Sequence, residues 1–270
     1  MAEYEVFEVA VGDIRMNVTK IGGGEKAFVM IPGLSLKPVS ESAAAVAGQY
    51  KKACDEYTIY LFDRKKNPEK GYTIRQMAKD TAEVMKKLGL SDVYAFGASQ
   101  GGMILQFLMI DYPGLIKKAV IGSSMARATA TSEKVLSKWV ELAKAGDPKA
   151  LNHDCFEKIY SEDFLKKYEA ALPVLESVGT PEDCENFVIL ASACDGFSAY
   201  EELDKVKAEV LVIGSTCDNV VSLKGSEEIA QKLGCELFVY DSYSHAVYDE
   251  APDYLDRILE FFSREGIINE

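Results

Sequence analysis

Ser99 lies in a short stretch whose composition suits a reactive serine. Residues 97–101 read Gly-Ala-Ser-Gln-Gly and stand between an apolar run and a second run typical of a buried helix. Between a strand and a helix, such a Gly-x-Ser-x-Gly sequence forms a sharp turn that presents the serine hydroxyl above a sheet. The alternative is a glycine-rich loop that contains a serine by chance. A free serine hydroxyl is a poor nucleophile, so the chain must also supply a base, an acid and donors for an oxyanion.

Histidine, the usual base for a serine, occurs at only two positions, His153 and His245. His153 stands between Asn152 and Asp154 in the middle of the chain, where a solvated surface position is expected. Any mechanism that uses histidine has to choose between these two residues.

Length and charge describe an ordinary globular protein. The chain has 270 residues, 48% of them hydrophobic, which is enough apolar material for one large core. The formal charge of −13 repels phosphate backbones and anionic lipids, so neither nucleic acid nor a membrane surface is expected as a partner. The N-terminus is acidic and alternating, and no apolar run is long enough to span a bilayer, which predicts a cytoplasmic protein. A homo-oligomer is compatible with all of this.

Cofactor motifs are missing from the sequence. The six cysteines are scattered without a Cys-x-x-Cys pair, which favours free thiols over a zinc site or a disulfide framework. The sequence contains neither a Gly-x-Gly-x-x-Gly nor a Walker motif. We therefore expect no metal, nucleotide or flavin, and a small molecule as the substrate.

Alternating strand and helix patterns predict a mostly parallel sheet that positions these residues. Residues 4–11 and 14–21 alternate apolar and polar side chains around Gly12-Asp13, which is typical of an antiparallel hairpin. Further strands are expected near Val29 and Leu61 and at residues 93–96, 119–121, 209–213 and 236–240. Helices are expected from a Thr73 cap to Gly89 and at residues 100–112, 226–233 and 254–262.

The alternation stops in the middle of the chain. Residues 135–146, 156–175 and 184–194 have helical patterns with no strand between them. We interpret residues 123–202 as an inserted helical cap, and residues 1–122 and 203–270 as the core that it interrupts.

The order of these motifs resembles the α/β-hydrolase family, in particular its small capped members. The resemblance rests on VMIPGLS, LFDR, FGASQGGMILQFL, VLVIGSTCDNVV and SYSHAVYDEAPDYLDRILEFF, which cover nearly all of the chain outside the cap. A serine elbow, an aspartate after a later strand and a late histidine follow one another in the family's order. The resemblance implies the α/β-hydrolase fold and hydrolytic activity.

The family pattern assigns a role to each member of this set. It makes Ser99 the nucleophile and His245 the base, on a loop after the last strand. Asp218, which follows the strand VLVIG, would orient the imidazole, although a turn-forming aspartate is an alternative there. Asp241 and Asp249 are nearer to His245 in sequence, but proximity in sequence does not place a carboxylate behind the ring.

The family also supplies two backbone N–H groups for the oxyanion. By position these are the amides of Gln100 and Leu34. The family typically reads His-Gly before the second donor, and this chain reads Pro32-Gly33 instead. The Leu34 amide can still act as a donor despite this difference, because it is a backbone group. Asp63-Arg64 matches a loop that the family often keeps near the pocket, where an ion pair or turn stabiliser is expected.

These residues predict a serine hydrolase that cleaves an ester, lactone or thioester of a small, hydrophobic acyl group through an acyl-enzyme. A carbon–carbon bond hydrolase or lyase with the same three residues is the alternative within enzymes, and turnover of aryl acetates separates the two. A non-catalytic ligand-binding protein on the same fold is the alternative from another class. An unreactive Ser99 in a folded protein would favour it.

Overall fold

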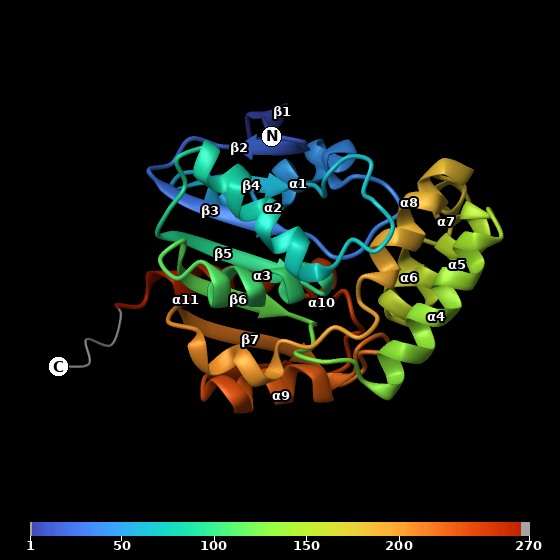
Figure 1. Ribbon diagram of the computed structural model, residues 1–270. Helices are drawn as coiled ribbons and strands as arrows, with labels where there is room; N and C mark the ends of the chain where they lie inside the picture. The colour runs from blue at the N-terminus through green and yellow to red at the C-terminus, as the bar shows by residue number, and fades with distance from the viewer. Residues whose placement is uncertain (1, 266–270) are drawn as a thin grey trace.

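The molecule is built around one eight-stranded sheet, seen in a computed structural model that describes residues 2–265 (Figure 1). The strands run in the order β1-β2-β4-β3-β5-β6-β7-β8. Their bounds are β1 Tyr4–Val11, β2 Ile14–Ile21, β3 Lys26–Ile31, β4 Tyr57–Phe62, β5 Val93–Ala98, β6 Ile116–Gly122, β7 Glu209–Ser215 and β8 Glu236–Tyr240. The pairings β1–β2 and β2–β4 are antiparallel and the rest are parallel. The predicted hairpin and mostly parallel sheet are confirmed.

Helices cover both faces of the sheet, because the strands after the hairpin are apolar on both sides. On one face a core cluster joins α2 (Ile74–Lys87), α3 (Gln100–Asp111) and α9 (Leu223–Leu233). On the other face a second cluster joins α1 (Ala43–Gln49) and α11 (Tyr254–Ser263), with the short α10 (Val247–Glu250) beside them. Short 3-10 turns lie at Val39–Ser42, Lys51–Ala53 and Tyr200–Lys205.

Local signals fix where the predicted helices start and stop. Thr73 caps α2 through a reciprocal capping box with Gln76. The helix ends before Gly89, whose φ of 70° lies in the left-handed region. The predicted start and stop of this helix are both confirmed.

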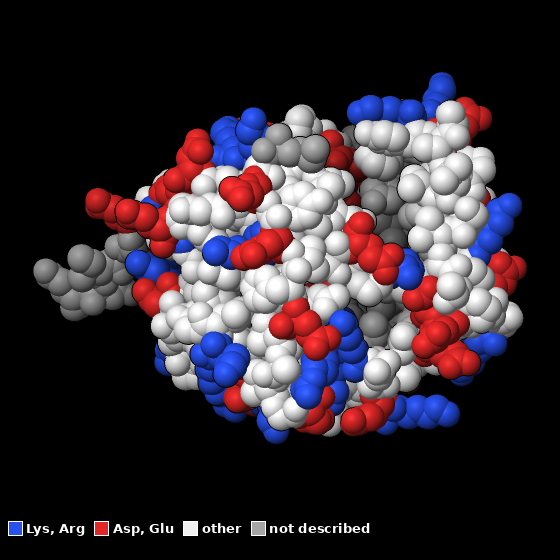
Figure 2. Space-filling view, turned by 90° about the horizontal axis from the view of Figure 1, so that it is seen from above, with Lys and Arg blue, Asp and Glu red and all other residues white. Residues whose placement is uncertain are grey.

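Five helices follow one another between β6 and β7 without an intervening strand. They are α4 Ala130–Lys144, α5 Pro148–Ile159, α6 Glu162–Lys167, α7 Leu172–Glu176 and α8 Pro181–Ser192, named here the α4–α8 segment. Figure 1 shows them grouped beside the carboxyl ends of the parallel strands. Figure 2 shows a groove between this group and the sheet with its helices, with acidic and basic side chains mixed along its rim. The division into a core and a cap stays a prediction.

The stretch 156–175 differs from the single helical run expected there. It comprises the end of α5, then α6 and α7. Tyr160 is extended, and the Ser161 side chain accepts from the amide of Phe164 to start a new helix. Pro173, near the start of α7, cannot donate to a preceding turn. Caps inside the apolar pattern therefore break the helix.

Among residues 2–265, no helix is long and apolar enough to cross a membrane. In the same residues no group of three or more histidine, cysteine or acidic side chains is arranged to hold a metal ion. All six cysteines are free thiols.

Candidate active site

Ser99 occupies a strained turn between β5 and α3. Its φ of 52° and ψ of −120° lie outside the regions that residues with a Cβ prefer. Its backbone is held on both sides: the Ser99 amide donates to the carbonyl of Gly122 at 2.8 Å, and the Ser124 hydroxyl donates to the Ser99 carbonyl at 2.8 Å. The strain is thus maintained by the neighbouring strand β6.

Glycine is required around this turn because backbones approach closely. A Cβ on Gly101 would lie 1.9 Å from the carbonyl oxygen of Ile31, at the end of β3. A Cβ on Gly97 would lie 2.6 Å from the carbonyl oxygen of Gly101. The two glycines let α3 start directly against β3 and β5, which places Ser99 at the carboxyl edge of the sheet.

Asp218 and His245 form a buried pair after β7 and β8. The Nδ1 atom of His245 lies 2.9 Å from Oδ2 of Asp218, and both side chains are at most 3% exposed. The other carboxylate oxygen accepts from the amides of Val220 and Val221 at 2.8 and 2.9 Å. Since Nδ1 faces the carboxylate, Nε2 is the nitrogen left for a substrate or nucleophile.

The surroundings of Asp218 keep its carboxylate ionised. Burial alone raises the pKa of this group, but the charge and hydrogen bond of His245 and the two backbone amides lower the pKa more. The pKa of Asp218 therefore lies below its ordinary value. An ionised carboxylate can orient an imidazole and stabilise its protonated form.

Ser99 and His245 lie at the same edge of the sheet, after β5 and β8. No hydrogen bond joins the Ser99 hydroxyl to the imidazole among residues 2–265. Catalytic hydrogen bonds are often long in a free enzyme and shorten when substrate binds. The structure thus brings Asp218 and His245 into contact and leaves Ser99 partly exposed at the same edge of the sheet.

The two predicted oxyanion donors lie on segments that meet at Ser99. Gln100 is the first residue of α3, where the backbone N–H has no partner within the helix. Leu34 follows Gly33 in the loop after β3. A Cβ on Gly33 would lie 3.3 Å from the Ser99 Cβ and 3.8 Å from its Oγ, so this loop passes directly over the nucleophile. The oxyanion roles of Leu34 and Gln100 stay predictions.

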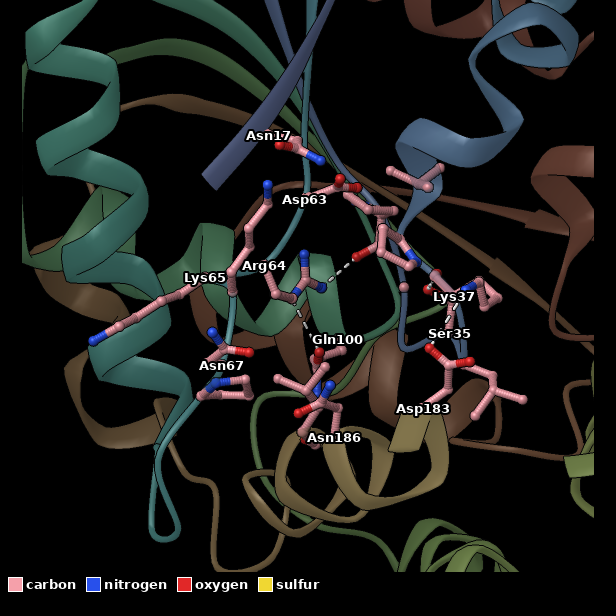
Figure 3. A pocket seen from close by; sticks show the side chains of 18 residues that line it. Asn17, Ser35, Lys37, Asp63, Arg64, Lys65, Asn67, Gln100, Asp183 and Asn186 are labelled. Atoms are coloured by element: carbon pink, nitrogen blue, oxygen red, sulfur yellow. Dashed lines mark hydrogen bonds and ion pairs between the residues drawn. The ribbon is translucent and has the colours of Figure 1, made fainter. Parts of the chain in front are cut away.

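Arg64 joins these two segments, which the sequence did not indicate. Its Nη2 donates to the carbonyl of Pro32 at 2.6 Å, and its Nε donates to the side-chain oxygen of Gln100 at 3.2 Å. Figure 3 shows the guanidinium between them. Of the two roles expected for Asp63-Arg64, an ion pair between them does not form within 4.0 Å in the described residues. The Asp63 carboxylate instead accepts from the amide and hydroxyl of Ser40, which agrees with the turn-stabilising alternative. Arg64 therefore contacts Gln100, one of the two predicted oxyanion donors, and Pro32, two residues before Leu34, the other.

The α4–α8 segment is attached to the site from two sides. The side-chain nitrogen of Gln100 donates to the Leu190 carbonyl in α8 at 2.7 Å. The amide of Ala246, next to His245, donates to the Ile159 carbonyl at the end of α5 at 2.8 Å. The segment therefore contacts both the serine turn and the histidine loop.

A pocket of about 220 Å³ opens beside the oxyanion segments. Gly33 and Gln100 line it, and so do Arg64 from the loop after β4 and Asn186 from α8 (Figure 3). Ser99, Asp218 and His245 do not line this pocket. Its link to the nucleophile is Gly33, where an added Cβ would lie 3.3 Å from the Ser99 Cβ.

The alternative candidates lie elsewhere. His153 is exposed on α5, where its Nδ1 lies 2.7 Å from a Glu176 carboxylate oxygen, as expected for a surface residue. Asp249 accepts from the Tyr160 hydroxyl at 3.2 Å. Neither Asp249 nor Asp241 contacts His245 through a hydrogen bond in the described part of the chain.

Comparison with known proteins places this arrangement in a family. Residues 52–252 match the model of the alpha/beta hydrolase fold family, so the chain belongs to that family. It is 23% identical to serine hydrolase BPHL of Mus musculus, over 94% of this chain and 85% of that one. These two matches identify an enzyme of the hydrolase class.

Solved structures share the fold. A hydrolase from Pseudomonas aeruginosa PA01 has a TM-score of 0.82 at 16% identity, covering 96% of this chain and 99% of its own. The enol-lactonase from Burkholderia xenovorans LB400 has a TM-score of 0.80 at 19% identity, covering 96% of this chain and all of its own. The predicted fold class is confirmed.

Proposed function

We propose that this protein is a serine hydrolase that cleaves an ester or lactone of a small acyl group through an acyl-enzyme. The observation that carries the proposal is the buried Asp218–His245 pair at the same sheet edge as the strained Ser99. A histidine at the surface does not need to be buried against an ionised carboxylate. A general base of this kind needs the imidazole and a carboxylate that orients it. The family membership and the named serine hydrolase relative support the same class.

The proposed reaction has two halves. Ser99 Oγ attacks the acyl carbonyl while His245 Nε2 takes its proton, and the amides of Leu34 and Gln100 bind the oxyanion. The C–O bond to the leaving group then breaks, and the imidazolium returns the proton to the departing oxygen. In the second half, water attacks the acyl-enzyme with His245 again as the base, which releases the acid and restores the serine.

The first test is labelling with a fluorophosphonate probe followed by intact-mass analysis. The native protein should gain one adduct, and Ser99→Ala and His245→Ala should gain none. Ser99→Ala should also lower hydrolysis of 4-nitrophenyl esters by at least about 10⁴-fold. Ser177→Ala is the matched control, because this exposed serine contacts only the Val174 carbonyl and its loss should change nothing.

Two results would contradict the proposal. Undiminished ester hydrolysis by Ser99→Ala would exclude Ser99 as the nucleophile. A folded native protein that neither labels nor hydrolyses any ester would favour a ligand-binding protein on this fold.

A further inference from the structure

The pocket beside the oxyanion segments contains a cation without an acidic partner. Three lysines line the pocket, and each is paired: Lys37 with Glu41 at 3.0 Å, Lys65 with Asp13 at 2.8 Å and Lys66 with Glu8 at 2.8 Å. Arg64 forms no ion pair within 4.0 Å among residues 2–265. Its two hydrogen bonds go to uncharged oxygens.

The acidic side chains of the pocket are already satisfied. Asp63 accepts from the amide and the hydroxyl of Ser40. Asp183 accepts from the amide and hydroxyl of Thr180, both at 2.8 Å, and lies 3.4 Å from Lys37 Nζ. Neither carboxylate is therefore the missing partner of Arg64.

Arg64 has donors left over. A guanidinium carries five N–H groups, and only Nε and one N–H of Nη2 are used, which leaves Nη1 and half of Nη2. Removal from water lowers the pKa of Arg64 to about 10, because this effect outweighs the charge of Asp63, which raises the pKa without forming an ion pair within 4.0 Å. Two free N–H groups on one side of a guanidinium match a carboxylate.

Amide side chains line the same pocket as this cation. Asn17, Asn67 and Asn186 line the same pocket, and within the described residues none of their side chains makes a hydrogen bond. Figure 3 shows these amides around Arg64, with Asn186 on the side of α8. Amide N–H groups are further donors for an anionic ligand.

We propose that this pocket is a carboxylate-binding subsite, so that the enzyme prefers esters or lactones whose substrate carries a free carboxylate. The inference rests on the proposed hydrolase function. The subsite is one residue away from the nucleophile, because Gly33 lines the pocket and lies against Ser99, and Gln100, which also lines it, follows Ser99 in the chain. A volume of about 220 Å³ suits a small dicarboxylate half-ester.

The experiment compares two substrates that differ in charge and by one methyl group, 4-nitrophenyl hydrogen glutarate and 4-nitrophenyl methyl glutarate. The native enzyme should show a kcat/KM at least about tenfold higher for the acid, since Arg64 is half-buried and forms no ion pair with an acidic side chain of the described residues. In Arg64→Gln this ratio should fall to about one, and Arg64→Lys should restore part of it. Asn186→Ala, which changes a residue outside the oxyanion segments, should lower the ratio severalfold.

The ratio of kcat/KM for the acid to kcat/KM for the methyl ester shows whether Arg64 binds the substrate carboxylate or only positions the oxyanion segments. If Arg64 only holds the oxyanion segments, Arg64→Gln slows both substrates equally and leaves the ratio unchanged, which would overturn the proposal. Arg75→Gln is the control, because Arg75 pairs with Asp111 and Glu202 away from the pocket. Its ratio should equal that of the native enzyme.

Calorimetry with glutarate keeps the two proposals distinguishable. The native protein should bind glutarate and Arg64→Gln should bind it at least about tenfold more weakly, whether or not any ester is hydrolysed. Hydrolysis of the neutral ester with no preference for the acid, together with no binding of glutarate, would overturn the subsite and leave the hydrolase function intact.

Discussion

At the scale of single residues, the site depends on groups placed by contacts far apart in the sequence. Asp218 and His245 are 27 positions apart, and the imidazole orientation depends on a carboxylate fixed by the amides of Val220 and Val221. Fixing the carboxylate through its second oxygen leaves the first one directed at the ring. The orientation of the imidazole is therefore built into the loop after β7.

Asp218→Asn should reduce kcat by about 10³–10⁴-fold, because an amide favours the wrong imidazole tautomer and does not stabilise the imidazolium. Steady-state kinetics with a 4-nitrophenyl ester measure this, and circular dichroism checks the fold. Asp241→Asn is the control, since this exposed side chain is not bound to His245 and its loss should leave kcat unchanged. Native kinetics in Asp218→Asn would move the acid to another carboxylate.

Sequence patterns predicted the candidate catalytic residues but not Arg64, which links the loop after β3 to the start of α3. Ser99 and His245 stand out through a motif and through scarcity. Arg64 does not, because its partners Pro32 and Gln100 are 32 and 36 positions away and meet it only once β3, β4 and β5 are adjacent. Because Arg64 binds a backbone carbonyl and an amide oxygen, no acidic residue at a telling spacing marks it in the sequence.

At the scale of elements, the serine turn works because α3 packs against β3 with no side chain between them. Periodicity predicted the strand and the helix on either side, and the glycines of the motif predicted the turn. Periodicity failed for residues 156–175, where caps at Ser161 and near Pro173 divide an apolar pattern into short helices. In this stretch the hydrogen bonds of the helix caps set where the helices begin and end. Such local bonds can interrupt a helix that the apolar periodicity predicts as continuous.

Gly101→Ala should destabilise the protein by about 3 kcal/mol or more, because the new Cβ would lie 1.9 Å from the Ile31 carbonyl and backbone cannot yield cheaply. Urea unfolding measures the change. Gly48→Ala is the matched control, since that helical glycine has no atom within 4 Å of an added Cβ. It should be neutral or stabilising by up to about 1 kcal/mol. Equal unfolding midpoints for Gly101→Ala and native protein would contradict the close packing.

At the scale of the whole molecule, the α4–α8 segment and the sheet share one apolar interior. Trp139 of α4 and Phe187 of α8 belong to the same core cluster as Ile104 of α3 and Val212 of β7. Polar contacts add to this at Gln100–Leu190 and Ala246–Ile159. The segment therefore has no separate core on which to fold.

We predict that the segment and the sheet unfold together. Trp139 is the single tryptophan of the chain and lies buried in α4, so its fluorescence reports on this segment alone. Far-UV circular dichroism reports on the whole chain. The two urea transitions should coincide. A fluorescence transition at lower urea would instead identify a cap that unfolds on its own.

The hydrogen bond between the Ala246 amide and the Ile159 carbonyl joins the loop of His245 to the end of α5. This link has a consequence for where the α4–α8 segment can vary in length. We expect insertions or deletions at the end of α5 to displace the loop of His245, the proposed base, and so to lower the proposed activity. Within residues 2–265, helix α7 makes no hydrogen bond to the loop of His245, and it exposes Val174 and Leu175 to solvent. We therefore expect changes in the length of α7 to leave the loop of the proposed base in place, so that substrate range can vary there without loss of the proposed activity.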